Sequence, residues 1–298
     1  MNDNQKCSII MPCYNAMPYL EMAIKSIYAQ TYKNWELIIV DDFSTDGTWE
    51  FLQRHSDSRI RLFRNGKNYG HSYTKNRCIE YAQGKYIARM DADDISLPIR
   101  LEKQIKFLEE NPSIDVCGCG SYKVNKDFRL IKTNFAVTTH SEIVNLAPLD
   151  IRFVFGSNFQ ITDGTIIARS EWFKKYKYDE KVRWSEDFDL MIRGLKDSLY
   201  ANINEPLYIY LRVGTTAPIK SQIKSIKQRV DSLFKYRHNL SSKMLVLMSF
   251  ISLLLRPIFI IMTGIFHKVV ANKILSSTLP PQVKKEVELI KNMKLKME

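Results

Sequence analysis

The stretch KYIARMDADDISLPIRLEKQ, residues 85–104, joins a short apolar run to an acidic cluster and then to a helical pattern. Tyr86 to Met90 reads as a buried strand, and Asp91-Ala92-Asp93-Asp94 follow at its carboxyl end. Pro98 precedes a helix expected from Leu101 to Glu110. Ligands of open parallel sheets bind outside the carboxyl ends of the strands, so these acids lie where a site is expected.

Upstream of this stretch, short apolar runs alternate with helical patterns, which is typical of βαβ units and a mostly parallel sheet. The expected strands cover residues 7–11, where Pro12 ends the run, 35–40 and 60–64. The expected helices cover residues 19–30, 71–82 and a segment capped by Thr45 or Asp46 that ends near residue 55. Residues 113–211 hold looser patterns, with strands expected at 116–124 and 165–168 and helices near 141–146 and 186–195.

The net charge of +12 is unevenly distributed along the 298 residues. Residues 1–211 hold 28 Lys and Arg and 28 Asp and Glu, whereas residues 212–298 hold 16 and 4. A basic appendage attracts anionic lipid or nucleic acid. We therefore expect a catalytic domain over residues 1–212, with a nucleotide-binding half (1–112) and an acceptor half (113–212), followed by a basic helical tail (213–298).

The five cysteines are scattered through apolar segments without metal-binding spacing, which favours a reducing compartment. The first residues, MNDNQK, do not resemble a secretion signal. We expect a cytoplasmic protein.

Three acidic features follow separate segments: Asp41-Asp42, Asp91-x-Asp93 and Glu186-Asp187. Each alone could be an acidic loop, and Glu186-Asp187 would favour the positive end of its helix. An Asp-x-Asp at a strand end places both carboxylates on one side of the chain. Two hard oxygen donors suit Mg²⁺ or Mn²⁺, which completes its octahedron with substrate phosphate oxygens. Such an ion makes a diphosphate a better leaving group, so this chemistry indicates a nucleoside diphosphate substrate.

Four motifs follow one another along the chain: SIIMPCYNA (8–16), ELIIVDDFSTDGT (36–48), the stretch 85–104 and WSEDFDLMIR (184–193). Together they resemble the inverting family 2 glycosyltransferases with the GT-A fold, over residues 7–195. The resemblance implies an α/β, Rossmann-like, mostly parallel sheet with helices on both faces. It also implies a nucleotide-diphospho-sugar donor, a divalent cation (Mn²⁺ or Mg²⁺) and a single displacement at the anomeric carbon.

The resemblance assigns the donor site residue by residue. Pro12, Tyr14 and Asn15 match the loop that frames the nucleobase, and Asp42 matches the acid that hydrogen-bonds to the base. The family's usual Arg-Asn-x-Gly becomes Lys75-Asn76-Arg77-Cys78 here. Lys75 still supplies a positive charge to the donor, but not a bidentate fork.

The resemblance also assigns the metal and the catalytic base. Within Asp91-Ala92-Asp93, Asp91 matches the first acid of the metal motif, near the ribose, and Asp93 matches the metal ligand. Asp187 matches the base that takes the proton from the acceptor hydroxyl, and Glu186 and Trp184 border the acceptor pocket. An inverting displacement needs a carboxylate opposite the leaving diphosphate, which agrees with a base from a distant segment. His71 is interpreted as a helix-start residue without a role in the mechanism.

The tail combines basic and apolar residues. Apolar residues recur at helical spacing from Ile219 to Phe234 with lysines on other faces, which predicts a basic amphipathic helix. Residues 244–266 are long enough to span a membrane but carry Arg256-Pro257 at their centre. We therefore expect interfacial helices or a re-entrant hairpin rather than a helix that crosses the membrane, with residues 219–273 on an anionic membrane surface. Core packing, or a homodimer through the tail, is the alternative.

The expected function is that of a metal-dependent hexosyltransferase on the inner face of the cell membrane. It would extend a lipid-linked or surface glycan of the lipopolysaccharide or capsule type, with UDP as the default nucleotide by resemblance. A sugar nucleotidyltransferase would need a Gly-rich basic loop after the first strand, and MPCYNAMPYL (11–20) is neither. A nucleic-acid-binding protein is supported by charge alone, so no nucleic-acid partner is expected.

Overall fold

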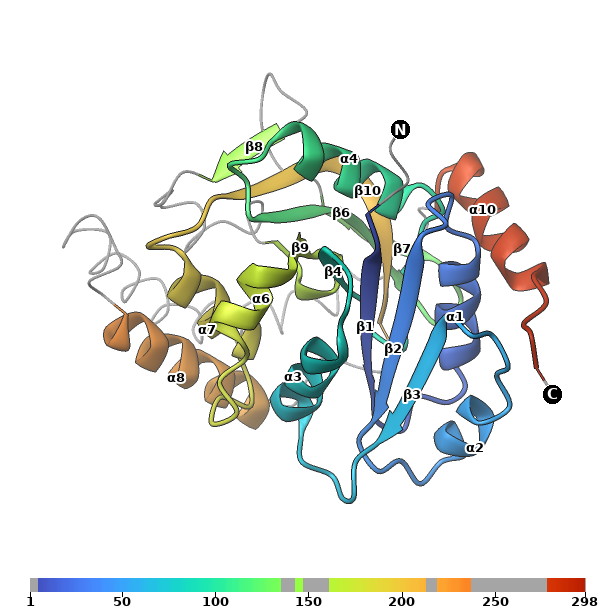
Figure 1. Ribbon diagram of the computed structural model, residues 1–298, viewed down its shortest axis with the longest axis horizontal. Coiled ribbons are helices and arrows are strands. Elements are labelled where there is room, and N and C mark those ends of the chain that lie inside the picture. The colour runs from blue at the N-terminus through green and yellow to red at the C-terminus, as the bar shows by residue number, and fades with distance from the viewer. Residues whose placement is uncertain (1–4, 135–142, 147–160, 213–218, 237–277, 298) are drawn as a thin grey trace.

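A ten-stranded sheet forms the centre of the molecule (Figure 1). The computed structural model describes residues 5–134, 143–146, 161–212, 219–236 and 278–297. The strand order is β3-β2-β1-β4-β9-β6-β10-β5, with β7 beside β6 and β8 beside β10. The strands are β1 Cys7–Cys13, β2 Trp35–Asp41, β3 Ile60–Arg64, β4 Tyr86–Arg89, β5 Ile95–Ser96, β6 Val116–Asn125, β7 Leu130–Asn134, β8 Ile143–Leu146, β9 Ile167–Arg169 and β10 Tyr200–Arg212.

The amino-terminal part of the sheet is parallel. β1 pairs in parallel with β2 and β4, and β2 pairs in parallel with β3. Every residue of β1, β2 and β4 is buried, as expected for parallel strands covered on both faces. Beyond β4 the sheet is mixed, because β9 lies antiparallel to both β4 and β6 while β6 and β10 are parallel. The predicted α/β fold is confirmed.

Pro12 does not end β1, so the expected end at Met11 was wrong. β1 continues to Cys13, and Pro12 stays in register with Val40 of β2. The Ile10 carbonyl accepts from Met90 N, so Ile10 faces β4, and Pro12, two residues on, faces the same side. β4 pairs with β1 only up to Ile10, so the missing N–H of Pro12 interrupts no ladder bond.

Helices cover both faces of the sheet, as predicted. One face carries α1 (Leu20–Tyr28), α2 (Thr48–Leu52) and α4 (Arg100–Glu110), and the other carries α3 (His71–Tyr81), α6 (Ser170–Tyr176) and α7 (Glu186–Gly194). In α1 the residues Leu20, Ala23, Ile24 and Ile27 recur at helical spacing and are all buried. These two apolar layers hold the strand ends in fixed positions.

The segment 143–146 is strand β8 and not the helix expected near residues 141–146. β8 pairs antiparallel with the first residues of β10, from Tyr200 to Ile203. Pairing with this edge satisfies the backbone groups of β10 that face away from β6, which a helix would leave open.

Two helices of the tail pack on the rest of the chain. α8 (Ile219–Lys235) buries Leu233 in the same apolar cluster as α7. α10 (Pro281–Asn292) buries Val283, Val287 and Ile290 against residues of β6 and β10, beside α1 (Figure 1). No helix of the described residues is long and apolar enough to cross a membrane. The apolar stretch 244–266 lies outside the described residues.

Candidate active site

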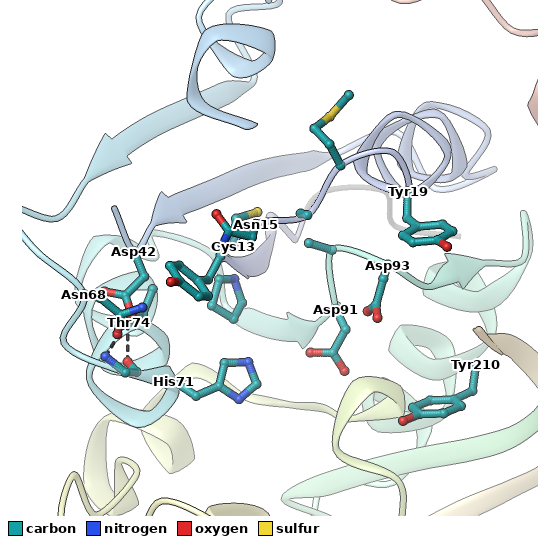
Figure 2. Close-up of a pocket in the computed structure, with 16 residues that line it drawn as sticks. Cys13, Asn15, Tyr19, Asp42, Asn68, His71, Thr74, Asp91, Asp93 and Tyr210 are labelled. Atoms are coloured by element: carbon teal, nitrogen blue, oxygen red, sulfur yellow. Dashed lines mark hydrogen bonds between the residues drawn. The ribbon is translucent and has the colours of Figure 1, made fainter. Parts of the chain in front are cut away.

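A cavity of about 720 Å³ opens at the carboxyl ends of β1 and β4 (Figure 2). Seven of the eight predicted donor residues line it: Pro12, Tyr14, Asn15, Asp42, Asp91, Ala92 and Asp93. The eighth, Lys75, does not line the cavity. Tyr19, Asn68 and Tyr210 line it as well, although no sequence pattern singled them out. His71, interpreted from the sequence as a helix-start residue without a role in the mechanism, also lines the cavity. The fold thus brings the loops after three separate strands to one hollow.

The loop after β1 is fastened to the loop after β2. Asn15 N donates to Ser44 Oγ at 2.9 Å, and Asn15 Oδ1 accepts from Thr45 N at 2.9 Å. Asn15 has a left-handed φ of +49°, a conformation that asparagine tolerates better than most residues. Tyr14 beside it remains 53% exposed, so its ring is available at the cavity wall.

Asp42 also lines the cavity, although its side chain is buried. Its carboxylate accepts from Asn65 Nδ2 at 2.6 Å, Tyr69 N at 2.9 Å and Gly70 N at 2.8 Å. A carboxylate offers about four acceptor positions, so roughly one remains for a ligand. Gly70 adopts a φ of +94° at this turn, which favours glycine. Asp42 therefore fixes the loop before α3 as well as facing the cavity.

Asp91 and Asp93 lie in the same cavity but in different electrostatic settings (Figure 2). Asp91 Oδ1 accepts from the buried Arg89 guanidinium at 2.6 Å. Burial, with the neighbouring Asp91 charge, raises the pKa of Asp93 to about 6. A carboxylate that is disfavoured as an anion gains most from a cation beside it. The pair therefore fits a divalent ion chemically.

The protein alone does not complete a metal site. Within the part of the chain that the structure describes, no group of three or more His, Cys, Asp or Glu side chains could hold a metal ion. Asp91 and Asp93 would supply only part of the ligand set, because two carboxylates cannot fill the six positions of an octahedral ion. The remaining ligands would have to come from water and from substrate phosphate oxygens.

A buried charge network leads from Asp91 to Glu186, the first residue of α7. Arg89 donates to Asp91 and to Asp163, with Arg89 Nη2 lying 2.8 Å from Asp163 Oδ2. The Lys75 ammonium lies 2.8 Å from Asp163 Oδ2 and 3.0 Å from Glu186 Oε1. Burial would raise the pKa of Asp163, but the charges of Arg89 and Lys75 hold it well below its usual range. These charged side chains therefore connect the Asp91–Asp93 pair to Glu186.

Sequence reasoning missed Asp163, although one signal pointed to it. Arg89 lies inside the apolar run of β4 and is fully buried, and a buried guanidinium needs a carboxylate partner. Asp163 belongs to the short 3-10 helix η1 (Asp163–Thr165), which precedes β9. The antiparallel pairing of β9 with β4 brings the two residues together.

Lys75 and His71 both contact Glu186. Lys75 is 1% exposed and its ammonium lies 4.5 Å from the Tyr178 ring centroid, so its charge is directed to two carboxylates. His71 Nδ1 lies 3.1 Å from Glu186 Oε1 while its ring projects into the cavity from the start of α3 (Figure 2). Burial alone would raise the pKa of Glu186, but the His71 hydrogen bond and the Lys75 charge lower it to about 2. Glu186 is therefore an anion at neutral pH.

Asp187 and Trp184 lie outside the lining of the cavity, next to Glu186. Asp187 is half-buried, its Oδ1 accepts from Phe188 N at 2.8 Å, and no ion pair with it is found among the described residues. Burial, then the Asp163 charge, raises the pKa of Asp187, which makes it a better proton acceptor. Trp184 is 43% exposed, and the Lys224 ammonium of α8 lies 5.0 Å from its ring centroid.

Two neighbouring regions carry the groups that the chemistry needs, the cavity with Asp91 and Asp93 and the start of α7 with Asp187. A cavity with two carboxylates can bind a diphosphate through a cation, and a neighbouring carboxylate of raised pKa can accept a proton. His71 and Glu186 join the two regions. Such an arrangement suits group transfer from a nucleoside diphosphate to a hydroxyl.

Comparisons with known proteins agree with this arrangement. The family model described as "Glycosyl transferase family 2" matches residues 8–177. The chain is 37% identical over 215 residues to the putative glycosyltransferase EpsE of Bacillus subtilis, covering 70% of this chain and 73% of EpsE. It is 28% identical over 253 residues to WfgD of Escherichia coli, "UDP-Glc:alpha-D-GlcNAc-diphosphoundecaprenol beta-1,3-glucosyltransferase", covering 84% and 93%.

The fold is also found among solved structures. The mannosyltransferase PcManGT of Pyrobaculum calidifontis, in complex with GDP-Man and Mn²⁺, superposes with a TM-score of 0.59 at 18% identity. The match covers 96% of this chain and 79% of that one. The family model, the sequence relatives and the fold agree, and this chain belongs to glycosyl transferase family 2.

Proposed function

We propose that the protein is an inverting hexosyltransferase that uses a UDP-linked sugar and a divalent cation, Mn²⁺ or Mg²⁺. The observation that carries this proposal is the single cavity in which the loop after β1, Asp42 and the Asp91–Asp93 pair meet. In this assignment Tyr14 and Asn15 frame the base, Asp42 hydrogen-bonds to it, and Asp93 with Asp91 holds the cation. The cation would offset the charge on the departing diphosphate.

The residues of the chain would bring the two substrates together in line. Asp187 takes the proton of the acceptor hydroxyl, and the oxygen attacks the anomeric carbon from the side opposite the diphosphate. The bond from that carbon to the diphosphate oxygen breaks, UDP leaves, and the configuration inverts. The raised pKa of Asp187 favours its role as base. Trp184, exposed beside it, would border the acceptor.

The proposed acceptor is a lipid-linked or surface glycan of the lipopolysaccharide or capsule type. The name of the Escherichia coli relative WfgD, which describes a UDP-glucose donor and a diphosphoundecaprenol-linked acceptor, supports this choice. The position of α8 supports it as well. Ser232 of α8 donates to Asp189 at 2.8 Å, and Ser185 donates to the Ser225 carbonyl, so α8 is fastened to the segment that carries Asp187.

We further propose that α8 faces the anionic inner surface of the cell membrane. Lys220, Lys224 and Lys227 are exposed on α8, and the apolar Ile223 beside them is 55% exposed. Basic and apolar side chains on one helix surface suit an anionic headgroup layer. Flotation with phosphatidylglycerol vesicles would then be lost when the three lysines are replaced by glutamate. Unchanged flotation would exclude α8 as the contact.

A donor screen tests the proposed activity directly. The protein would be heated with UDP-, GDP- and dTDP-linked sugars, each with Mn²⁺ and with EDTA, and its melting temperature recorded. We expect a rise only for a UDP-sugar and only with the cation, because binding to the folded state alone stabilises it. A rise that is equal in EDTA would remove the cation from donor binding, and no rise with any donor would contradict the proposal.

A further inference from the structure

His71 occupies the junction between the donor cavity and the proposed base. It lines the cavity together with Asp91 and Asp93, and its Nδ1 lies 3.1 Å from Glu186 Oε1. Glu186 immediately precedes Asp187 at the start of α7. Of the cavity-lining residues, His71 is thus the one that the structure joins by a hydrogen bond to the Glu186–Asp187 pair.

The chemistry of transfer places the sugar at this junction. The sugar is bonded to the diphosphate, which the Asp91–Asp93 pair would hold, and the acceptor oxygen approaches from the Asp187 side. The anomeric carbon must therefore lie between those carboxylates and Asp187. A residue that faces the cavity and also contacts the neighbour of Asp187 borders the same space.

The contact with Glu186 also fixes the orientation of the His71 ring. Glu186 is a carboxylate, since the His71 hydrogen bond and the Lys75 charge outweigh its burial and lower its pKa to about 2. A carboxylate only accepts hydrogen bonds, so Nδ1 carries the proton that faces it. Nε2 is on the other side of the ring, which projects into the cavity (Figure 2).

We propose that His71 is a sugar-contacting residue that hydrogen-bonds a hydroxyl of the transferred sugar through Nε2 while Nδ1 is held by Glu186. This inference rests on the proposed function and adds a residue that discriminates between sugars. Asp42 and Tyr14 would bind the nucleotide, and His71 would bind only what the nucleotide carries. Because His71 is 54% exposed and lies in the first turn of α3, substitution there should leave the fold intact.

Two amide variants separate the two nitrogens of the ring. In His71→Asn the amide replaces Nδ1 and keeps the Glu186 contact, but nothing reaches into the cavity. In His71→Gln the longer side chain brings its amide to the place of Nε2. If His71 only positioned Glu186, the asparagine variant would behave like the wild type. If Nε2 binds the sugar, the glutamine variant is the one that recovers affinity.

The test measures the dissociation constants of UDP, UDP-glucose and UDP-N-acetylglucosamine by calorimetry with Mn²⁺. For the UDP-sugar that the wild type binds more tightly, His71→Ala and His71→Asn should weaken binding about 3- to 10-fold, the loss of one hydrogen bond. UDP alone should bind each variant as it binds the wild type. Lys67→Ala, an exposed change in the loop before α3 and outside the cavity, should alter neither affinity.

Equal losses for UDP and the UDP-sugar, or no loss for either, would overturn the role of His71 and leave the proposed function standing. Wild-type affinity for the asparagine variant would also overturn it, since Nδ1 alone would then account for the residue. A wild-type protein that binds none of the three ligands would contradict the proposed function itself, and this inference with it.

Discussion

Asp163 provides the sharpest test of the buried charge network. Its carboxylate is 13% exposed and accepts from Lys75 at 2.8 Å, from Arg89 at 2.8 and 3.0 Å and from Tyr178 at 2.7 Å. Asp163→Asn keeps the shape of the side chain and removes its charge. Two cations that are fully buried then lose a shared partner.

The expected cost is about 3 kcal/mol in the free energy of unfolding at pH 7. Breaking a buried ion pair costs about 3–5 kcal/mol, and we expect the lower end because each cation keeps one carboxylate. Arg89 retains Asp91 at 2.6 Å, and Lys75 retains Glu186 at 3.0 Å. Urea unfolding followed by tryptophan fluorescence measures this change, because Trp172 of α6 is buried in the apolar layer between the helix and the sheet.

The control is Glu80→Gln, which removes an exposed pair of similar length. Glu80 lies 2.8 Å from Lys177, and the two side chains are 53% and 45% exposed. Exposed pairs contribute about 0–1 kcal/mol, so this variant should stay within that range. If Asp163→Asn is destabilised no more than Glu80→Gln, the network has no structural role and the reasoning is refuted.

The pH dependence gives a second readout for the same variant. The pKa of Asp163 is held well below its usual range in the folded state. A carboxyl with a lowered pKa stabilises the fold above its unfolded pKa of about 3.9, and this contribution is lost as the pH falls below that value. The wild type should therefore lose stability more steeply than Asp163→Asn below about pH 4. If the free energy of unfolding falls equally steeply below about pH 4 in the wild type and in Asp163→Asn, the pKa of Asp163 is not lowered.

Three further predictions address the metal pair, Glu186 and the tail. Asp93→Asn should melt at the wild-type temperature or above it in EDTA, because a carboxylate whose pKa is raised to about 6 destabilises the fold at pH 7, and should lose the Mn²⁺-dependent rise with UDP. A lower melting temperature in EDTA would show that Asp93 is structural. Glu186→Gln should flatten the loss of stability between pH 4.5 and about 2, where the lowered pKa of Glu186 acts. An unchanged slope in urea titrations across that range would refute it. Ile290→Ala in α10 should cost about 2–5 kcal/mol because Ile290 is fully buried, whereas Leu289→Ala, at 59% exposure, should stay within about 0.5 kcal/mol. Equal effects in urea unfolding would mean that α10 does not pack on the sheet.

Much of the fold follows from local sequence patterns. β1, β2, β3 and β4 are short apolar runs separated by helical patterns, and such alternation leads to parallel pairing. The carboxyl ends of parallel strands share one edge, so the acids after β2 and β4 lie close together, and both line one cavity. In this part of the chain the alternation of apolar runs and helical patterns is enough to predict the parallel pairing.

The rest depends on contacts between distant segments. Asp163 meets Arg89 only because β9 runs antiparallel beside β4, and nothing in the residues around Asp163 indicates that pairing. Pro12 is compatible with β1 because of the side of the strand that it faces, which depends on where β4 ends. His71 looked like a helix-start residue because its partner, Glu186, lies far along the chain. The sequence motifs located the carboxylates of the site, and only the structure revealed the charged side chains of Arg89, Lys75 and Asp163 that connect them.

The central claim is that donor binding and proton removal are separate tasks, with Asp187 responsible for the second. The direct measurement compares Asp187→Asn with the wild type in two quantities, the dissociation constant of the UDP-sugar with Mn²⁺ and the rate of transfer to a glycan acceptor. The account predicts an unchanged dissociation constant and a loss of transfer of at least about 100-fold, the lower limit for general-base catalysis. Transfer at the wild-type rate by the Asp187→Asn protein would contradict the account.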